Sequence, residues 1–361
     1  MTAHRVNAGS PLLSVSDLKI RIRMDAGTLA AVDGVDFEIK RGKTLGLVGE
    51  SGCGKSLTSR AIIAINPKEC ETSGSIRFQS ASESSAQPVD LLKLDPTGRP
   101  IRSIRGKKIS MIFQEPMTAF SPMYSIGNQI VEAILTHRTK NKSEAKRIAL
   151  DMLRKVGISD EEKRFEQFPH EFSGGMRQRA MIAMSLSCNP ELLIADEPTT
   201  ALDVTIQAQV LELMKQLQQE FGMAILLVTH DLGIIAEMCD EVAVMYLGKI
   251  VEQSTVKEIF NNPKHPYTKG LLHSMPKLGR KHARLESIEG TVPLALDMPP
   301  MCGFYDRCKE RMPGLCDQQA VPVTRVSPDH TVRCFLYDEK GEEVERHVKA
   351  DSAGQSLDEA L

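Results

Sequence analysis

The sequence lacks three features that would point to a membrane span, a polyanionic partner or secretion. No stretch approaches the ~20 consecutive apolar residues that a membrane-spanning helix requires. The 45 basic and 47 acidic residues give a formal charge of −2, so no global field attracts nucleic acid or an anionic membrane. Residues 1–11 lack the apolar core of a signal peptide. We therefore expect a cytosolic protein, without nucleic acid as a partner, that reaches a membrane only through other proteins.

The apolar pattern predicts an α/β fold. Residues 12–39 alternate apolar and polar side chains, which predicts antiparallel strands with turns at Asp25-Ala26-Gly27 and Asp33-Gly34. Short apolar runs then alternate with helical patterns, and these runs are residues 44–48, 109–113, 192–195, 224–229 and 242–246. That alternation predicts a largely parallel sheet covered on both faces.

A second pattern predicts a helical insertion within this α/β core. Residues 116–186 carry no strand signal, while residues 126–135 and 143–156 have helical spacing. We expect this insertion to carry Ser173 at its far end.

The length of 361 residues allows about two domains. Pro, His and Cys become frequent after residue 253, so we place a domain boundary near residue 255. The expected organisation is an α/β domain over residues 12–255, a small domain over 256–337 and a disordered tail over 338–361. The tail is acidic and polar, with little to bury.

A phosphate-binding loop is indicated by the template G-x-x-x-x-G-K-[ST], which lies between the apolar run at 44–48 and a helical segment. The matching residues are Gly49, Glu50, Ser51, Gly52, Cys53, Gly54, Lys55 and Ser56. Successive backbone N–H groups and a helix N-terminus bind phosphate oxygens in such a loop. We expect Lys55 to contact the β- and γ-phosphates of a nucleotide and the Ser56 hydroxyl to bind Mg²⁺.

Polar residues at the ends of three other predicted strands complete a candidate catalytic set. Asp196 ends one strand, where its carboxylate can bind Mg²⁺. Glu197 follows it and can accept a proton from an attacking water; alone, such a pair is equally typical of a strand-end turn. His230 follows another strand and can contact the γ-phosphate, although a lone His is more often structural. Gln114 follows a third strand, and its amide can contact Mg²⁺ or water.

The run Phe172-Ser173-Gly174-Gly175-Met176-Arg177-Gln178, between the phosphate loop and Asp196, carries the resemblance to a known family. Over residues 12–255 the chain resembles the ATP-binding subunits of ABC transporters, which have a P-loop NTPase core. Residues 49–56 resemble Walker A, Gln114 the Q-loop, residues 172–178 the signature, residues 192–197 Walker B, residues 200–203 the D-loop, and His230 the switch histidine.

The resemblance implies head-to-tail dimers of two ATPase subunits. In such a dimer Ser173, Gly174 and Gly175 cap the γ-phosphate bound to the partner's Walker A, and Asp203 communicates between the two sites. The signature departs from the family's Leu-Ser-Gly-Gly-Gln by beginning with Phe172 and ending with Met176. The family's adenine-stacking aromatic is also missing, since residues 18–25 offer only Ile22 or Met24. We expect this loss to weaken affinity or relax nucleotide preference.

A narrower resemblance, extending to residue 337, is to the oligopeptide/dipeptide importer branch. It is carried by Asn262-Pro263-Lys264-His265-Pro266-Tyr267-Thr268 and by the late cysteines with Phe335-Leu336-Tyr337. It implies two related ATPase subunits, two membrane permeases and an extracytoplasmic binding protein. The chain would then be peripheral, at the cytoplasmic face of the plasma (inner) membrane.

Four of the eight cysteines form a cluster with the spacing C-x5-C-x7-C-x17-C, namely Cys302, Cys308, Cys316 and Cys334. In a cytosolic chain clustered cysteines indicate metal rather than disulfides. Four thiolates can hold zinc or an iron–sulfur cluster. Paired C-x2-C knuckles are absent, and members of the resembled branch carry a 4Fe–4S cluster here, so we expect that cluster, with zinc as the alternative.

The sequence therefore predicts an ATP-hydrolysing subunit that energises import of peptides. Four other roles stay open. The same branch serves nickel, opines and oligosaccharides, and the binding protein and permeases determine the solute. A soluble ABC ATPase would usually carry long coiled-coil insertions or two ATPase halves, and neither is visible. An exporter subunit or an inactive scaffold fits less well with the late cysteines and the intact catalytic set.

Overall fold

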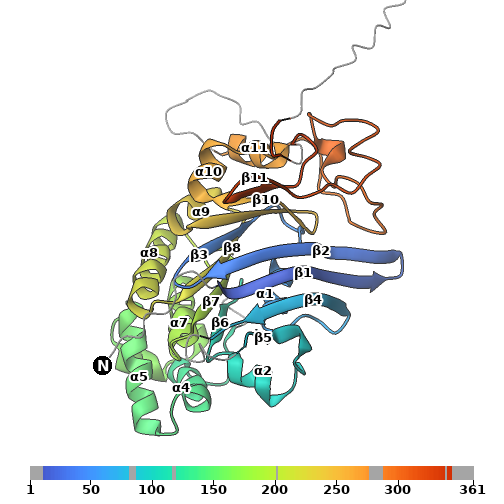
Figure 1. The fold of residues 1–361 in the computed structure, drawn as a ribbon. Helices are drawn as coiled ribbons and strands as arrows, with labels where there is room; N and C mark the ends of the chain where they lie inside the picture. The colour runs from blue at the N-terminus through green and yellow to red at the C-terminus, as the bar shows by residue number, and fades with distance from the viewer. Residues whose placement is uncertain are drawn as a thin grey trace, which may run out of the picture.

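A computed structural model describes residues 11–80, 87–115, 119–200, 202–275, 288–337 and 340–343. The expected disordered tail lies outside the described residues except for 340–343. Two sheets and a group of helices make up the molecule (Figure 1). No helix within the described ranges combines the length and the apolar character needed to cross a membrane.

The smaller sheet is antiparallel, as predicted for residues 12–39. Its four strands have the order β2-β1-β4-β5, and they are β1 (Pro11–Met24), β2 (Gly27–Lys40), β4 (Cys70–Phe78) and β5 (Val89–Asp90). The turn at Asp25-Ala26 is confirmed, but the turn predicted at Asp33-Gly34 is wrong, because β2 continues through it. Leu18 faces Val35 and Lys19 faces Asp33, so Gly34 is an extra residue in a β-bulge, with φ of 73°.

The larger sheet confirms the predicted strands and contains the core. Its order is β11-β12-β10-β9-β3-β8-β7-β6, with β3 (Thr44–Val48), β6 (Ile109–Ile112), β7 (Leu192–Asp196), β8 (Ala224–Thr229), β9 (Glu241–Tyr246), β10 (Lys249–Thr255), β11 (Thr324–Ser327) and β12 (His330–Val332). The five strands from β9 to β6 pair in parallel and are almost entirely buried, as expected for a sheet covered on both faces. Parallel pairing brings the carboxyl ends of these strands to one edge.

Helices cover this sheet and form the predicted insertion. The insertion contains α4 (Ile126–His137), α5 (Lys142–Lys155), α6 (Glu161–Glu166), η3 (Pro169–Glu171) and α7 (Gly174–Leu186). The remaining helices are α1 (Lys55–Ile62), η2 (Leu91–Lys93), α2 (Arg99–Ile104), α8 (Val204–Phe221), α9 (Leu232–Met238), α10 (Val256–Asn261), α11 (Pro266–His273) and η4 (Tyr305–Arg307). Apolar side chains of α4, α5 and α7 share one core with β7 and α8, so the insertion packs against the sheet.

The chain after residue 255 folds back onto the larger sheet (Figure 1). β12 pairs with β10, and the buried carboxylate of Glu252 in β10 accepts a hydrogen bond from His330 Nε2 in β12 at 2.7 Å. The same carboxylate accepts the backbone N–H groups of Lys264 and His265. Burial raises the pKa of Glu252, but these hydrogen bonds outweigh burial and lower it. A charged, fully bonded carboxylate therefore fixes this segment to the core.

Candidate functional site

The phosphate loop leaves the carboxyl end of β3 and enters α1 at Lys55. Two of its glycines are required by close backbone neighbours. A Cβ atom on Gly49 would lie 2.1 Å from the carbonyl oxygen of Met245, and one on Gly54 would lie 2.3 Å from that of Ala31. Gly54 also has φ of 100°, which side chains disfavour. The loop is therefore wrapped tightly between β2 and β9.

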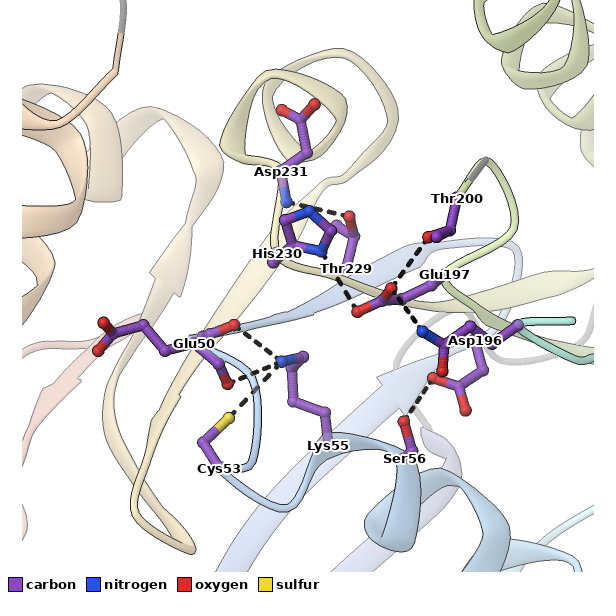
Figure 2. A network of polar contacts seen from close by, with 12 residues as sticks. Glu50, Cys53, Lys55, Ser56, Asp196, Glu197, Thr200, Thr229, His230 and Asp231 are labelled. Atoms are coloured by element: carbon purple, nitrogen blue, oxygen red, sulfur yellow. Dashed lines mark hydrogen bonds and ion pairs between the residues drawn. The ribbon is translucent and has the colours of Figure 1, made fainter. Parts of the chain in front are cut away.

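Lys55 is buried, and Figure 2 shows its ammonium directed toward Glu50 and Cys53 of this loop. Its Nζ donates hydrogen bonds to the carbonyl oxygens of Gly49 at 2.8 Å and Glu50 at 3.0 Å. Cys53 lies alongside with its sulfur 3.7 Å from Nζ, and burial raises the pKa of that thiol. The Lys55 ammonium is thus held by backbone carbonyl groups of its own loop, and the neutral thiol of Cys53 lies beside it.

Asp196 and Ser56 form a small site with an unused oxygen. Ser56 Oγ donates to Asp196 Oδ1 at 3.0 Å, and Asp196 is fully buried at the end of β7. The other carboxylate oxygen, Oδ2, is buried and has no hydrogen-bond partner among the residues that the structure describes. Burial also raises the pKa of Asp196. A hydroxyl beside an unpartnered buried carboxylate oxygen fits Mg²⁺, which binds through one or two protein groups and takes its other ligands from phosphate and water.

Three side chains contact the carboxylate of Glu197, and Figure 2 shows two of them, Thr200 and His230. Its Oε2 accepts hydrogen bonds from Gln114 Nε2 at 3.1 Å and Thr200 Oγ1 at 2.9 Å, and its Oε1 lies 3.3 Å from His230 Nδ1. Glu197 has φ of 48°, an uncommon value for a side chain of this size. Its backbone N–H donates to Val228 O at 2.8 Å, which fixes this turn against β8. The structure thus brings Gln114, Glu197 and His230 together.

The residues assigned to a partner's nucleotide lie elsewhere. Ser173 caps α7 by accepting the N–H of Met176 at 3.3 Å, and Ser173 and Gly174 are exposed. Gly175 follows in the first turn of α7. Asp203 caps α8 through Ile206 N–H at 3.0 Å and is also exposed. None of these four residues lines the cleft at Lys55 within one chain.

A cleft of about 310 Å³ runs past the phosphate loop and is lined partly by residues that the sequence reasoning missed. Lys55, Ser56, Gln114 and Glu197 line it, and Ile22 and Leu29 line it too. The further lining residues come from the C-terminal segment and are Pro293, Leu294 and Ala295. No local pattern marks these three residues, because their role depends on where the chain returns.

Arg307 is a further residue of the site that the sequence did not predict. It lies 257 positions along the chain from its partner Glu50 in the phosphate loop. Its Nη1 and Nη2 donate to the two carboxylate oxygens of Glu50 at 2.7 and 3.1 Å, and its side chain is 5 % exposed. Tyr267 Oη also accepts the backbone N–H of Glu50 at 2.9 Å. Two groups from the C-terminal segment therefore hold the second residue of the loop.

The four late cysteines line one small cavity. Burial and the neighbouring cysteines raise the pKa of Cys308 to about 11 and that of Cys334 to about 12. Across the ranges that the structure describes, no group of three or more His, Cys, Asp or Glu side chains is placed to hold a metal ion. The expected metal site is thus unsupported by this geometry, although the cysteines do converge.

Comparisons with known proteins match transporter families in both halves of the chain. A model described as ABC transporter matches residues 32–200, and one described as oligopeptide/dipeptide transporter, C-terminal region matches residues 251–316. The dipeptide transport ATP-binding protein DppD of Bacillus subtilis is 48 % identical over 333 residues, covering 92 % of this chain and 96 % of that protein. A putative peptide import ATP-binding protein of Brucella melitensis is 47 % identical, covering 91 % and 98 %.

Solved structures agree on the fold. The ATP-binding cassette MJ0796, in a dimeric post-hydrolysis state bound to ADP and Pi, superposes with a TM-score of 0.58 at 23 % identity. The superposition covers 68 % of this chain and 98 % of that one. Cassette cbiO1 of Clostridium perfringens gives a TM-score of 0.56 at 27 % identity, covering 70 % and 91 %.

Replacing Asp196 by Asn should abolish the Mg²⁺-dependent part of nucleotide binding without lowering the stability of the metal-free protein. The amide keeps the size of the carboxylate but removes the charge that Mg²⁺ requires and that burial penalises. The measurement is the thermal midpoint with ATP and Mg²⁺ against ATP and a chelator, since a bound ligand raises the midpoint.

Asp90→Asn provides the control, because Asp90 caps η2 away from this site and should leave the Mg²⁺ response intact. An undiminished Mg²⁺ response in Asp196→Asn would contradict the assignment.

Proposed function

The chain belongs to the ABC transporter ATP-binding family, and from that premise we propose that it hydrolyses ATP to drive import of peptides through a membrane permease. The support for peptides is that the similar proteins are named as dipeptide, oligopeptide or peptide import ATP-binding proteins and that the C-terminal region matches the corresponding model. The observation that carries hydrolysis is Glu197, held beside Lys55 and Ser56 in one cleft.

In the proposed reaction the loop's N–H groups and Lys55 bind the phosphates, while Ser56 and Asp196 hold Mg²⁺. The metal, when bound, neutralises charge on the phosphate oxygens. Glu197 orients a water molecule and accepts its proton as the water oxygen attacks the γ-phosphorus. The bond from that phosphorus to the bridging oxygen breaks, and ADP and phosphate leave.

Gln114 and His230 are proposed as sensors of the γ-phosphate. Both contact the Glu197 carboxylate, and each follows a different strand of the larger sheet. Gln114 also leads into the helical insertion, so a change at the γ-phosphate can be transmitted to that insertion. A side chain that contacts both the general base Glu197 and the γ-phosphate can align the two groups with each other.

A second subunit is proposed to complete the site. Ser173, Gly174 and Gly175 lie at an exposed helix N-terminus, where backbone N–H groups bind anions, and they do not reach the cleft of their own chain. They would cap the γ-phosphate held by a sister subunit, and Asp203 would lie at the contact. Two permease subunits, fed by an extracytoplasmic binding protein, would hold this pair at the cytoplasmic face of the plasma membrane.

We further propose that Cys302, Cys308, Cys316 and Cys334 hold a 4Fe–4S cluster, with zinc as the alternative. The support is that the four thiols line one cavity. A single zinc ion needs all its donors within ~2.3 Å, whereas a cluster accepts a wider set of thiolates. When bound, the cluster would cross-link a segment that has few large apolar residues.

Glu197→Gln should bind ATP normally but hydrolyse it at least ~10²-fold more slowly, because the amide cannot accept the proton. ATP-bound dimers with the sister subunit should accumulate, measured by size-exclusion chromatography and phosphate release. The matched control is Glu237→Gln on the exposed side of α9, which should hydrolyse ATP like the wild type. Undiminished hydrolysis by Glu197→Gln would remove Glu197 as the base.

Protein purified without oxygen should contain about four iron and four sulfide per chain if the cysteines hold the proposed cluster. Cys316→Ser should lose that iron, while Cys70→Ser, which lies outside the cavity, should keep it. Stoichiometric zinc without iron would contradict the 4Fe–4S assignment and support the zinc alternative. The absence of both metals would refute a metal site at these cysteines.

A further inference from the structure

The end of the nucleotide cleft farthest from the phosphate loop is built partly by the C-terminal segment. The neighbouring residues 295–297 run alongside the start of β2. Ala30 N–H donates to Ala295 O at 3.0 Å, and Leu29 pairs with Leu296 in an isolated bridge. Asp297 N–H donates to Thr28 O at 3.1 Å, and its carboxylate accepts Thr28 N–H at 3.2 Å. The backbone next to Leu294 is thus fixed against the smaller sheet.

The order of residues along β2 shows which end of the cleft this is. The Ala31 carbonyl is in close contact with Gly54 of the phosphate loop, since a Cβ there would lie 2.3 Å away. Leu29 is two residues farther along the strand, a displacement of ~7 Å from that contact. Ile22 of β1 is paired with Leu29. Because Lys55 and Ser56 mark the phosphate end, Ile22 and Leu29 lie at the nucleoside end.

Leu294 is 78 % exposed although its backbone lies next to a fixed segment. Isolated exposed leucines are ordinary, but this one lines the same cleft as the partly exposed Ile22 and Leu29 and as Pro293. Together they form an apolar surface with no aromatic ring among them. Such a surface can cover the flat and largely apolar face of a ligand.

We propose that Leu294, with Ile22 and Leu29, forms the purine-binding subsite of the cleft. This inference rests on the proposed function, and it assigns to a C-terminal residue the role that a stacking aromatic would otherwise fill. Among the described residues that line this end, no side chain carries a hydrogen-bond donor or acceptor. The subsite therefore covers the face of the base and does not read its edge, so adenine and guanine are bound with similar affinity.

Leu294→Ala should raise the Kd of both MgATP and MgGTP about fivefold, because it removes apolar surface that a purine covers. The Kd of inorganic tripolyphosphate should stay unchanged, since that ligand has no base. Leu294→Phe should lower the Kd of MgATP, because a ring stacks better on a purine. All three affinities can be measured by calorimetry on the full chain.

The matched control is Val323→Ala, another exposed apolar residue, which lies away from this cleft and should leave every affinity unchanged. An unchanged MgATP affinity in Leu294→Ala, or an equal loss of tripolyphosphate affinity, would overturn the subsite. If the wild-type chain bound tripolyphosphate and MgATP with the same Kd, the base would contribute no affinity. That result would refute the subsite but not the phosphate site. A wild-type chain that bound neither ligand would instead refute the proposed function.

Discussion

The ion pair between Glu50 and Arg307 joins the phosphate loop to the C-terminal segment, and much of the site depends on it. Glu50 places a negative charge in a loop that must attract an anion. Arg307 offsets that charge with two hydrogen bonds at 2.7 and 3.1 Å, from a side chain that is almost fully buried. Removing one partner of such a pair leaves the other charge unpaired, which costs more than the pair contributes.

Several contacts with the larger sheet and within the C-terminal segment position Arg307 beside the phosphate loop. Glu252 and His330 join β10 to β12, and Tyr267 packs fully buried against Tyr246 and Phe304. Arg307 lies over the rings of Tyr246 and Phe304, and the next residue is Cys308 at the cysteine cavity. One continuous set of contacts thus runs from the cavity to the phosphate loop.

Local sequence patterns predicted the features that local physics determines. Buried parallel strands need continuous apolar runs, and the phosphate loop needs glycines at fixed offsets, so β3, β7, β8 and the loop were all predictable. Asp33-Gly34 was mistaken for a turn because a bulge and a turn use the same residue types. Arg307 and Leu294 carried no local signal, because their partners lie more than 250 positions away in the chain and only the folded topology brings them together.

The C-terminal segment contributes directly to nucleotide binding, through Arg307 at the phosphate loop and Leu294 at the cleft. The most direct measurement is the Kd of MgATP for Arg307→Met, which keeps the apolar stem but leaves Glu50 charged beside the phosphates. The matched variant is Arg311→Met, whose exposed guanidinium lies over the ring of Tyr305 and donates a long hydrogen bond, at 3.5 Å, to the carbonyl oxygen of Asp306. We expect at least a ~10-fold weaker affinity for Arg307→Met and wild-type affinity for Arg311→Met. Equal affinities, with both variants folded, would contradict it.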